Sequence, residues 1–271
     1  MAEANISSRD RYGSATVNLH RARSLTAVVP ATPTLYALII GIGTYFNNSL
    51  SLQNDFPAHD ADNFATELQK QQGLAFNKVL IYKSTLEDSM ATSDNIKDGL
   101  EWLEKNAQDA SDVALIYFSG HGKDSYLLPF NFDGSETKTG IFKGQIIDAL
   151  ARTNGRAILV IDACQAAAGL DIKGLVNDAR STPHAIMSIL SSMPDQPSLG
   201  DVQLNSYFTT ALIQALEGNG LLPQYNDVLT SDIASYLTRR LKDKDLGGGK
   251  QTASVVWPVN WEHFRIAVVK K

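Results

Sequence analysis

The sequence predicts an α/β domain in which a mainly parallel sheet of about six strands is flanked by helices on both faces. Short apolar runs alternate along the chain with longer segments of helical periodicity, as in consecutive βαβ units. The runs are apolar at successive positions, which is typical of strands buried on both faces. The chain has 271 residues, 44% of them hydrophobic and 20% charged, so it can enclose a core and is not disordered over most of its length.

The strands are expected where the apolar runs lie. The first run, LYALIIGIG, begins at Leu35, and the others occupy 79–82, 112–118, 156–162, 185–190 and 264–269. Each run is short and rich in branched or aromatic residues, which favours a strand over a helix.

The helices are expected in the amphipathic segments 58–72, 93–106, 141–150, 206–217 and 228–242. In the first of them Ala61, Phe64 and Leu68 share one face of a helix, with polar residues opposite. Ser93 or Asp94 is placed to cap the second. The glycine run at 247–249 predicts a flexible loop.

The chain divides into an extension and a domain. Residues 1–34 carry four arginines against two acidic residues, and Pro30 and Pro33 disfavour a helix or a central strand there. We expect 1–34 to be an N-terminal extension and 35–271 to be the domain. Within the domain, small and polar residues predict a loop at about 166–184.

Charge and cysteine content restrict the setting in which the protein works. The formal net charge of −5 argues against a broad basic surface for nucleic acid. Cys164 is the only cysteine, so an intrachain disulfide cannot form and a reducing compartment is favoured. The start of the chain does not resemble a secretory signal, and no run approaches the roughly 18 apolar residues of a membrane helix. We expect a cytoplasmic protein without membrane or nucleic-acid partners.

Two predicted strands end in residues that can carry chemistry. The strand at 112–118 leads to His121, which stands between two glycines, and the strand at 156–162 leads to Cys164. Parallel strands gather their carboxyl ends at one edge, so neighbouring strands would bring the two side chains together. An imidazole beside a thiol can take its proton and return it to a leaving amine. The amides of Gly122 and Cys164 are candidate oxyanion donors.

Each residue also has a plainer interpretation. A cysteine that follows a buried strand is most often a small core residue. A histidine between glycines can serve as a structural or capping residue. The pairing of the two strand ends favours the catalytic interpretation.

Three segments resemble the caspase-like cysteine peptidases: YALIIGIGTY, YFSGHG and ILVIDACQAAAG, in that order. The resemblance covers about 35–252 and is closer to the metacaspase and bacterial orthocaspase branch than to animal caspases. It implies a three-layer sandwich and endopeptidase activity through a thioester acyl-enzyme. It also implies that His121 is the general base and acid, that Cys164 is the nucleophile, and that protein or peptide chains are the substrates.

Substrate preference is expected from two acidic residues. Asp162 lies two positions before Cys164 on a strand, so both side chains point to one face, where a carboxylate would suit an arginine or lysine. Asp60, in His59-Asp60-Ala61, is similar to the second basic-pocket aspartate of the family, with His59 in place of an asparagine. Asp162 could instead be structural at the strand end, and Asp60 could be a helix cap or first-turn carboxylate.

The sequence also departs from the family pattern. Cys164 is followed by Gln165-Ala166, where many relatives have His-Ser-Gly. Some metacaspases need calcium, but only Asp124, Asp133 and Glu136 are acidic in the corresponding region, so calcium activation is not implied and stays open. The dyad requires no cofactor, and no metal site is expected.

Activation and assembly are expectations of the same kind. Relatives often cut themselves after the cysteine, and Lys173 and Arg180 are candidate processing sites there, as are Arg21 and Arg23 in the extension. The protein could be a zymogen that awaits an activating protease or regulatory partner. Lys270 and Lys271 after the last strand favour a monomer over an edge-to-edge dimer. The alternatives are a non-catalytic caspase-fold scaffold that binds partners and a flavodoxin-like small-molecule-binding protein.

Overall fold

A seven-stranded sheet forms the centre of the fold, in the order β13-β9-β8-β4-β1-β2 with β3 also paired to β1. The strands are β1 (Thr34–Gly41), β2 (Lys78–Ile81), β3 (Leu86–Glu87), β4 (Val113–Gly120), β8 (Arg156–Ala163), β9 (Ile186–Leu190) and β13 (Ser254–Val256). Every pairing is parallel except that of β13 with β9. This computed structural model describes residues 33–52, 56–83, 85–164, 166, 186–193, 199, 205–242, 244–245, 250–258 and 261–270.

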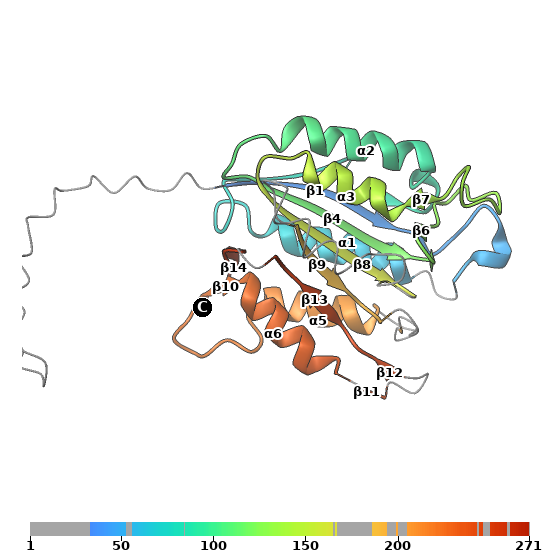
Figure 1. The fold of residues 1–271 in the computed structure, drawn as a ribbon. Coiled ribbons are helices and arrows are strands. Elements are labelled where there is room, and N and C mark those ends of the chain that lie inside the picture. The colour runs from blue at the N-terminus through green and yellow to red at the C-terminus, as the bar shows by residue number, and fades with distance from the viewer. Residues whose placement is uncertain are drawn as a thin grey trace, which may run out of the picture. The chain divides into compact units, whose positions relative to one another are not determined.

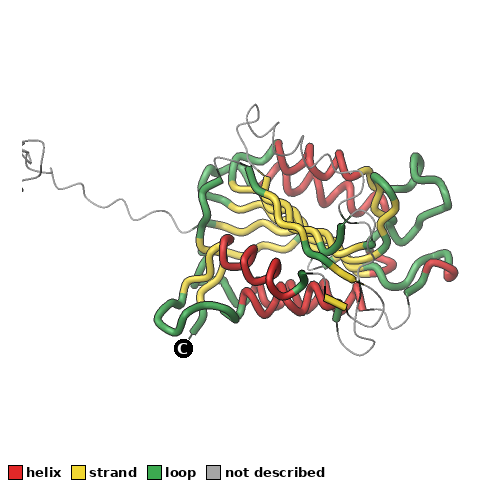
Figure 2. The backbone as a smooth tube through the Cα atoms, turned by 60° about the horizontal axis from the view of Figure 1, so that its bottom comes forward, coloured by secondary structure: helices red, strands yellow, loops and turns green. Residues whose placement is uncertain are grey.

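Helices cover both faces of the sheet, which gives three layers (Figures 1 and 2). One face packs against α1 (Phe56–Gln69), α5 (Tyr207–Leu216) and α6 (Thr230–Arg240), and the other against α2 (Ser93–Asn106) and α3 (Lys143–Ala151). The predicted α/β fold, with a mainly parallel sheet between helices, is therefore confirmed.

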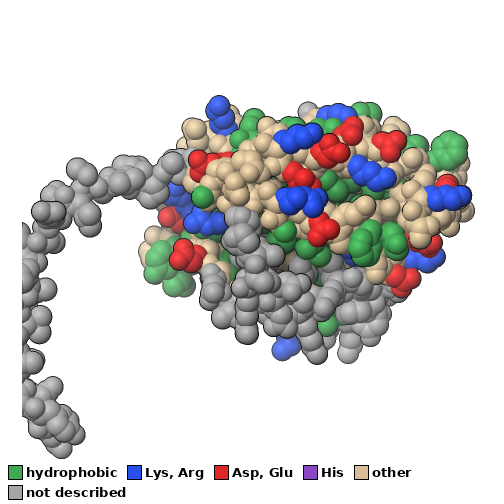
Figure 3. All heavy atoms as spheres, turned by 45° about the horizontal axis from the view of Figure 1, so that its top comes forward, with side chains coloured by type: hydrophobic (Ala, Val, Ile, Leu, Met, Phe, Trp, Pro, Cys, Tyr) green, Lys and Arg blue, Asp and Glu red, His purple; other side chains and the backbone are tan. Residues whose placement is uncertain are grey.

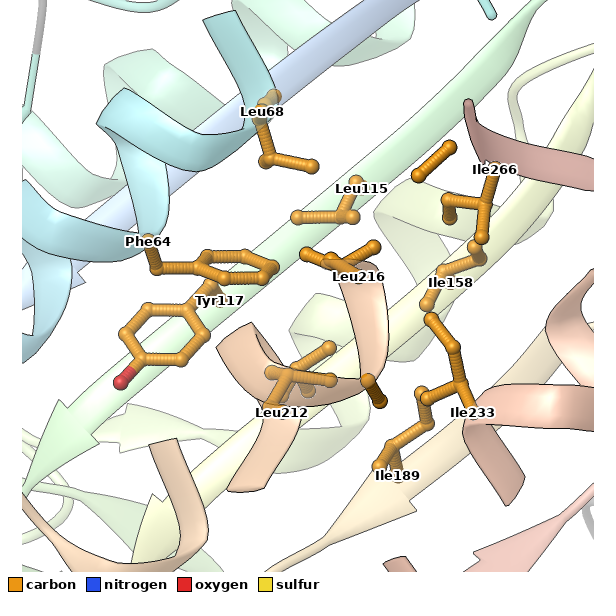
Figure 4. Close-up of a cluster of buried hydrophobic side chains, with 14 of the residues drawn as sticks. Phe64, Leu68, Leu115, Tyr117, Ile158, Ile189, Leu212, Leu216, Ile233 and Ile266 are labelled. Atoms are coloured by element: carbon orange, nitrogen blue, oxygen red, sulfur yellow. The ribbon is translucent and has the colours of Figure 1, made fainter. Parts of the chain in front are cut away.

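The alternation of side chains along each strand explains why the strands are apolar throughout. In β1, Leu35, Ala37 and Ile39 belong to the core under α1, α5 and α6, whereas Leu38 and Ile40 belong to the core under α2 and α3. Figure 4 shows the first of these cores. Phe64 of α1 lies there against Tyr117 of β4, with ring centroids 4.7 Å apart.

Several short elements surround the sheet. A small three-stranded sheet contains β5 (Gly122–Lys123), β6 (Tyr126–Leu127) and β7 (Ile141–Phe142). Two further sheets have two strands each: one pairs β10 (Asp227–Leu229) with β14 (Arg265–Val268), and the other pairs β11 (Lys244–Asp245) with β12 (Lys250–Gln251). Single 3-10 turns occupy Asn48–Leu50 and Asp88–Met90. Apart from β14, which the sequence predicted as a strand at 264–269, the sequence patterns did not indicate these elements because each is too short to show a period.

Some sequence-based expectations need correction. The expected last strand forms as β14, but it pairs with β10 outside the central sheet, and the edge position belongs to β13. Lys270 therefore follows a strand that lies outside the central sheet and gives no argument about edge pairing, and Lys271 lies outside the described residues. The cap of α2 is Thr92, whose hydroxyl accepts from the Asn95 amide, rather than Ser93 or Asp94. The helix expected from 141 begins at Lys143, because 141–142 form β7.

The surface and the ends of the domain add little to this picture. Figure 3 shows acidic and basic side chains interspersed over the visible face. Within the described residues, no helix has the length and apolar character needed to cross a membrane. The extension up to residue 32, the loop 167–185 and the glycines at 247–249 lie outside the described residues.

Candidate active site

The two residues expected to carry the chemistry follow neighbouring strands. β4 and β8 pair in parallel, with Ser119 opposite Asp162 and Gly120 opposite Ala163. His121 is the next residue after β4, and Cys164 is the next after β8. The hydrogen-bond register therefore delivers the imidazole and the thiol to the same carboxyl edge of the sheet, where α/β proteins build their sites.

Gly122 brings the two strand ends into close contact. A Cβ atom placed on Gly122 would lie only 2.8 Å from the Cys164 carbonyl oxygen and 3.2 Å from the Ala163 Cβ. Glycine is thus required here for the backbone after the histidine to pass against the backbone of the cysteine. This close approach also brings the backbone of Gly122 beside that of Cys164, and the amides of these two residues are the predicted oxyanion donors.

The histidine is held at its backbone and at its ring. The His121 amide donates to the Tyr45 hydroxyl at 2.9 Å, and the two rings lie with centroids 5.2 Å apart. On the ring, Nε2 lies 2.8 Å from the Leu50 carbonyl oxygen. A carbonyl can only accept, so Nε2 carries the proton in the neutral ring and Nδ1 keeps the lone pair that could accept a thiol proton.

Buried hydroxyl groups hold the turn that carries the half-buried cysteine. The Ala163 carbonyl accepts from Ser192 Oγ at 3.0 Å and from Ser191 Oγ at 3.3 Å. On the other side of the cysteine, the Ala166 amide donates to Ser192 Oγ at 3.2 Å. Both serines follow β9 and are fully buried, so the thiol of Cys164 projects from a turn that is fixed before and after it.

The two predicted pocket carboxylates are both buried and are joined by one residue. Asp60 and Asp162 have side chains that are 0% and 3% exposed. Ser206, which caps α5, donates its amide to Asp60 at 2.9 Å and its hydroxyl to Asp162. Asp60 also accepts from Ser119 Oγ at 3.1 Å, and Asp162 from Thr209 Oγ1 at 2.9 Å. The structure therefore brings Asp60, Asp162 and the strand ends into one constellation.

Burial and mutual repulsion act on these acids. Burial raises the pKa of Asp60 well above its usual range, and the neighbouring charge of Asp162 raises it further. Burial and the same two acids also raise the pKa of the Tyr117 phenol, which bonds to Thr209. Two like charges with little access to water create a negative potential, so a cation brought to this position would be attracted strongly.

The non-functional interpretations of Asp60 and Asp162 have different outcomes. The cap interpretation of Asp60 is wrong, because α1 begins at Phe56, has no acidic residue in its first turn, and turns Asp60 toward the sheet. A structural role of Asp162 stays open, since its partners Ser206 and Thr209 lie at the start of α5.

Other predicted residues do not join this constellation or lie outside the described residues. Glu136 pairs with Lys123, and Asp133 accepts from Ser135 and Thr139. No group of three or more His, Cys, Asp or Glu side chains among the described residues is arranged to hold a metal ion. Arg21, Arg23, Gln165, Lys173 and Arg180 lie outside the described residues.

The sequence did not point to several residues of the site. Tyr45, Ser119, Ser191, Ser192, Ser206 and Thr209 all bond to the functional residues or to their turns. Ser119 could have been found by the rule that placed Asp162, because it lies two positions before His121 as Asp162 lies two before Cys164. The others come from distant parts of the chain and leave no local signal.

Comparisons with known proteins agree with the fold. The family model described as the caspase domain matches residues 34–255. A protein of Geobacter sulfurreducens has a similar solved structure, with a TM-score of 0.62, 14% identity and coverage of 88% of this chain and 100% of that one. Caspase-1 from Spodoptera frugiperda is also similar, with a TM-score of 0.60, 16% identity and coverage of 89% and 92%. No curated protein sequence matches the chain.

Proposed function

Because the chain belongs to the caspase-domain family of peptidases, we propose that it is a cysteine endopeptidase that cleaves peptide bonds after arginine or lysine. The observation that carries the proposal is the in-register pairing of β4 with β8, whose next residues are His121 and Cys164. The close approach of Gly122 to the Cys164 carbonyl supports it, because the backbone after His121 then passes against the backbone of the cysteine.

The reaction uses the dyad in two stages. The Cys164 sulfur attacks the scissile carbonyl carbon while His121 Nδ1 accepts the thiol proton. The amides of Gly122 and Cys164 donate to the oxyanion, and His121 then returns the proton to the leaving amine. A thioester links the substrate's acyl part to Cys164. Water, deprotonated by the same imidazole, attacks this thioester and releases the acid product and the free thiol.

The preference for a basic residue rests on Asp60 and Asp162. A guanidinium or ammonium group would relieve the repulsion between the two buried carboxylates and gain two charge-assisted partners. An aspartate side chain in the same place would add a third negative charge. Cleavage after aspartate is therefore disfavoured by electrostatics.

The remaining features are proposals on the same basis. The SGHG and DAC motifs followed by ILSSMPDQPSLGD favour the metacaspase and orthocaspase branch. A zymogen that is cut after Lys173 or Arg180 would satisfy its own specificity, and an activating protease or regulatory partner could make the same cut. We further propose a cytoplasmic monomer that needs no cofactor, with calcium activation left to the assay.

The test is hydrolysis of matched fluorogenic peptides that end in arginine, lysine or aspartate, with and without calcium, by the wild type and Cys164→Ala. We expect turnover after arginine and lysine that the substitution abolishes. Turnover after aspartate would keep the peptidase and contradict the pocket assignment.

The main alternative is a caspase-fold scaffold that binds partners without catalysis. Neither His121 nor Cys164 is needed by such a scaffold, so the presence of both favours the peptidase. Intact mass under activating conditions separates a latent enzyme from a scaffold, because a self-processing enzyme yields fragments that Cys164→Ala does not.

A further inference from the structure

Lys143 is a fully buried lysine in the part of the domain next to the dyad. It is the first residue of α3, and its side chain is 0% exposed. Its position is unfavourable in two ways. An ammonium group loses its hydration on burial, and a positive charge at a helix N-terminus opposes the helix dipole. A methionine or leucine of similar volume would avoid both costs, so the charge calls for a functional explanation.

The ammonium group bonds to the two turns that follow the dyad residues. Lys143 Nζ donates to the Asp124 carbonyl at 2.9 Å and to the Ala166 carbonyl at 3.3 Å. Asp124 lies in the turn between β5 and β6, three residues after His121, and Ala166 lies two residues after Cys164. From the start of α3, the lysine therefore reaches the turns that follow both dyad residues.

The geometry of each turn is adapted to this contact. Asp124 adopts a left-handed backbone conformation with φ of 48°, which is uncommon for a residue other than glycine, and its carbonyl is the one that Lys143 binds. The backbone amide of Lys143 donates to the neighbouring Ser125 carbonyl at 2.8 Å, so the helix start and the turn are joined twice. At the other end, Ala166 is held by Ser192 through its amide and by Lys143 through its carbonyl.

We propose that Lys143 is a positioning residue whose charged ammonium group fixes the β5–β6 turn, which follows His121, relative to the turn at Cys164, and so keeps the His121/Cys164 dyad aligned. This inference rests on the proposed peptidase function and deepens it. The lysine acts through the two turns and not on the substrate, so its loss should lower kcat and leave KM nearly unchanged.

The contact of Lys143 with the two turns should depend on pH, because it depends on the charge of the ammonium group. Burial lowers the pKa of Lys143 to about 8, against the opposing effect of the Asp124 carboxylate, which is the charged group acting on it among the described residues. Above pH 8 the ammonium becomes an amine with fewer and weaker donors. The two turns should then loosen relative to each other.

The kinetic test compares the wild type with Lys143→Met, which keeps the length of the side chain and removes its charge. Lys123→Met is the matched control, because Lys123 lies in the β5–β6 hairpin that Lys143 binds but is exposed and pairs with Glu136. We expect Lys143→Met to lower kcat by about 100-fold, the order of loss for a misplacement of about 1 Å, with KM within about twofold. The melting temperature should stay close to that of the wild type, and Lys123→Met should behave as the wild type.

Two further readouts keep the inference separate from the proposed function. Alkylation of Cys164 by iodoacetamide needs no peptide and is unambiguous in a chain with one cysteine. We expect Lys143→Met to slow it by about tenfold at pH 7, because the histidine no longer meets the thiol. A wild type that is alkylated rapidly but cleaves no peptide would contradict the proposed function and leave the role of Lys143 standing.

Hydrogen exchange of the wild-type protein decides the question if Lys143→Met does not fold. Amides of 122–128, corrected for intrinsic rates, should lose protection between pH 7 and pH 9, whereas those of β4 should not. The inference is overturned if 122–128 keep their protection, or if a folded Lys143→Met retains kcat and alkylation rate within about threefold of the wild type.

Discussion

Replacing Asp162 by asparagine tests the proposed basic-residue pocket most sharply, because a pocket residue should change specificity with little effect on stability, whereas a structural residue should do the reverse. The asparagine side chain keeps an oxygen that can accept from Ser206 and Thr209. It removes one of two buried negative charges. We therefore expect the enzyme to lose its preference for arginine without losing its fold.

The expected magnitude follows from the burial of the two carboxylates. Asp60 and Asp162 are 0% and 3% exposed, so a guanidinium bound between them would be shielded from water. Loss of one partner from a buried ion pair costs about 3–5 kcal/mol, which corresponds to roughly 100- to 5,000-fold in kcat/KM. Because Asp60 remains, we expect a loss near the lower end, about 100-fold, for a peptide that ends in arginine.

The assay compares peptides that end in arginine and in citrulline, which has nearly the same shape without the charge. The wild type should prefer arginine, and Asp162→Asn should lose most of that preference while its melting temperature at pH 7 falls by no more than about 2 °C. Asp98→Asn, on the exposed face of α2, is the control. An unchanged arginine-to-citrulline ratio together with a clear fall in melting temperature would refute the pocket and favour a structural role at the start of α5.

Three other predictions concern the same edge of the sheet. Because the pKa of Asp60 is raised in the folded state, the folded protein holds this proton more tightly than the unfolded chain does. As pH falls through that raised pKa, the stability of the fold should increase and KM for arginine peptides should rise. Asp60→Asn should remove both effects, which pH titrations of the melting temperature and of KM will measure. Gly122→Ala should cost about 1–3 kcal/mol in the free energy of unfolding and lower kcat by at least about tenfold, because the added Cβ would lie 2.8 Å from the Cys164 carbonyl oxygen. Denaturant melts and kinetics that match those of the wild type would contradict the close approach. Tyr45→Phe should lower the free energy of unfolding by about 1–3 kcal/mol, because it leaves the His121 amide without its acceptor, and thermal melts will measure this loss. In kinetics, kcat should fall by a larger factor than KM changes.

The sequence was informative where the chemistry follows from local pattern. Apolar runs gave the strands that form the parallel core, and the residues just after two of them are His121 and Cys164. The period of a strand placed Asp162 on the same face as Cys164, and the structure puts Asp162 in the buried network with Asp60.

The sequence was uninformative where the site depends on contacts between distant segments. Tyr45 reaches His121 across 76 positions of the chain, and Ser206 reaches Asp60 across 146. Lys143 had the pattern of an ordinary residue in the helix expected from 141, and only the packed structure shows that its charge is buried between the two turns. Short strands such as β13 were missed because three residues cannot show a period.

Covalent trapping with an arginyl acyloxymethyl ketone tests the central claim most directly, because it requires the thiol, the histidine and the acidic pocket at once. The thiolate displaces the carboxylate of the probe, so the wild type should gain the mass of one probe less that leaving group, and peptide mapping should place the adduct on Cys164. His121→Ala should be labelled far more slowly, and a matched probe that ends in aspartate should not compete. No adduct on Cys164, or equal labelling by the two probes, would contradict a dyad that acts on basic residues.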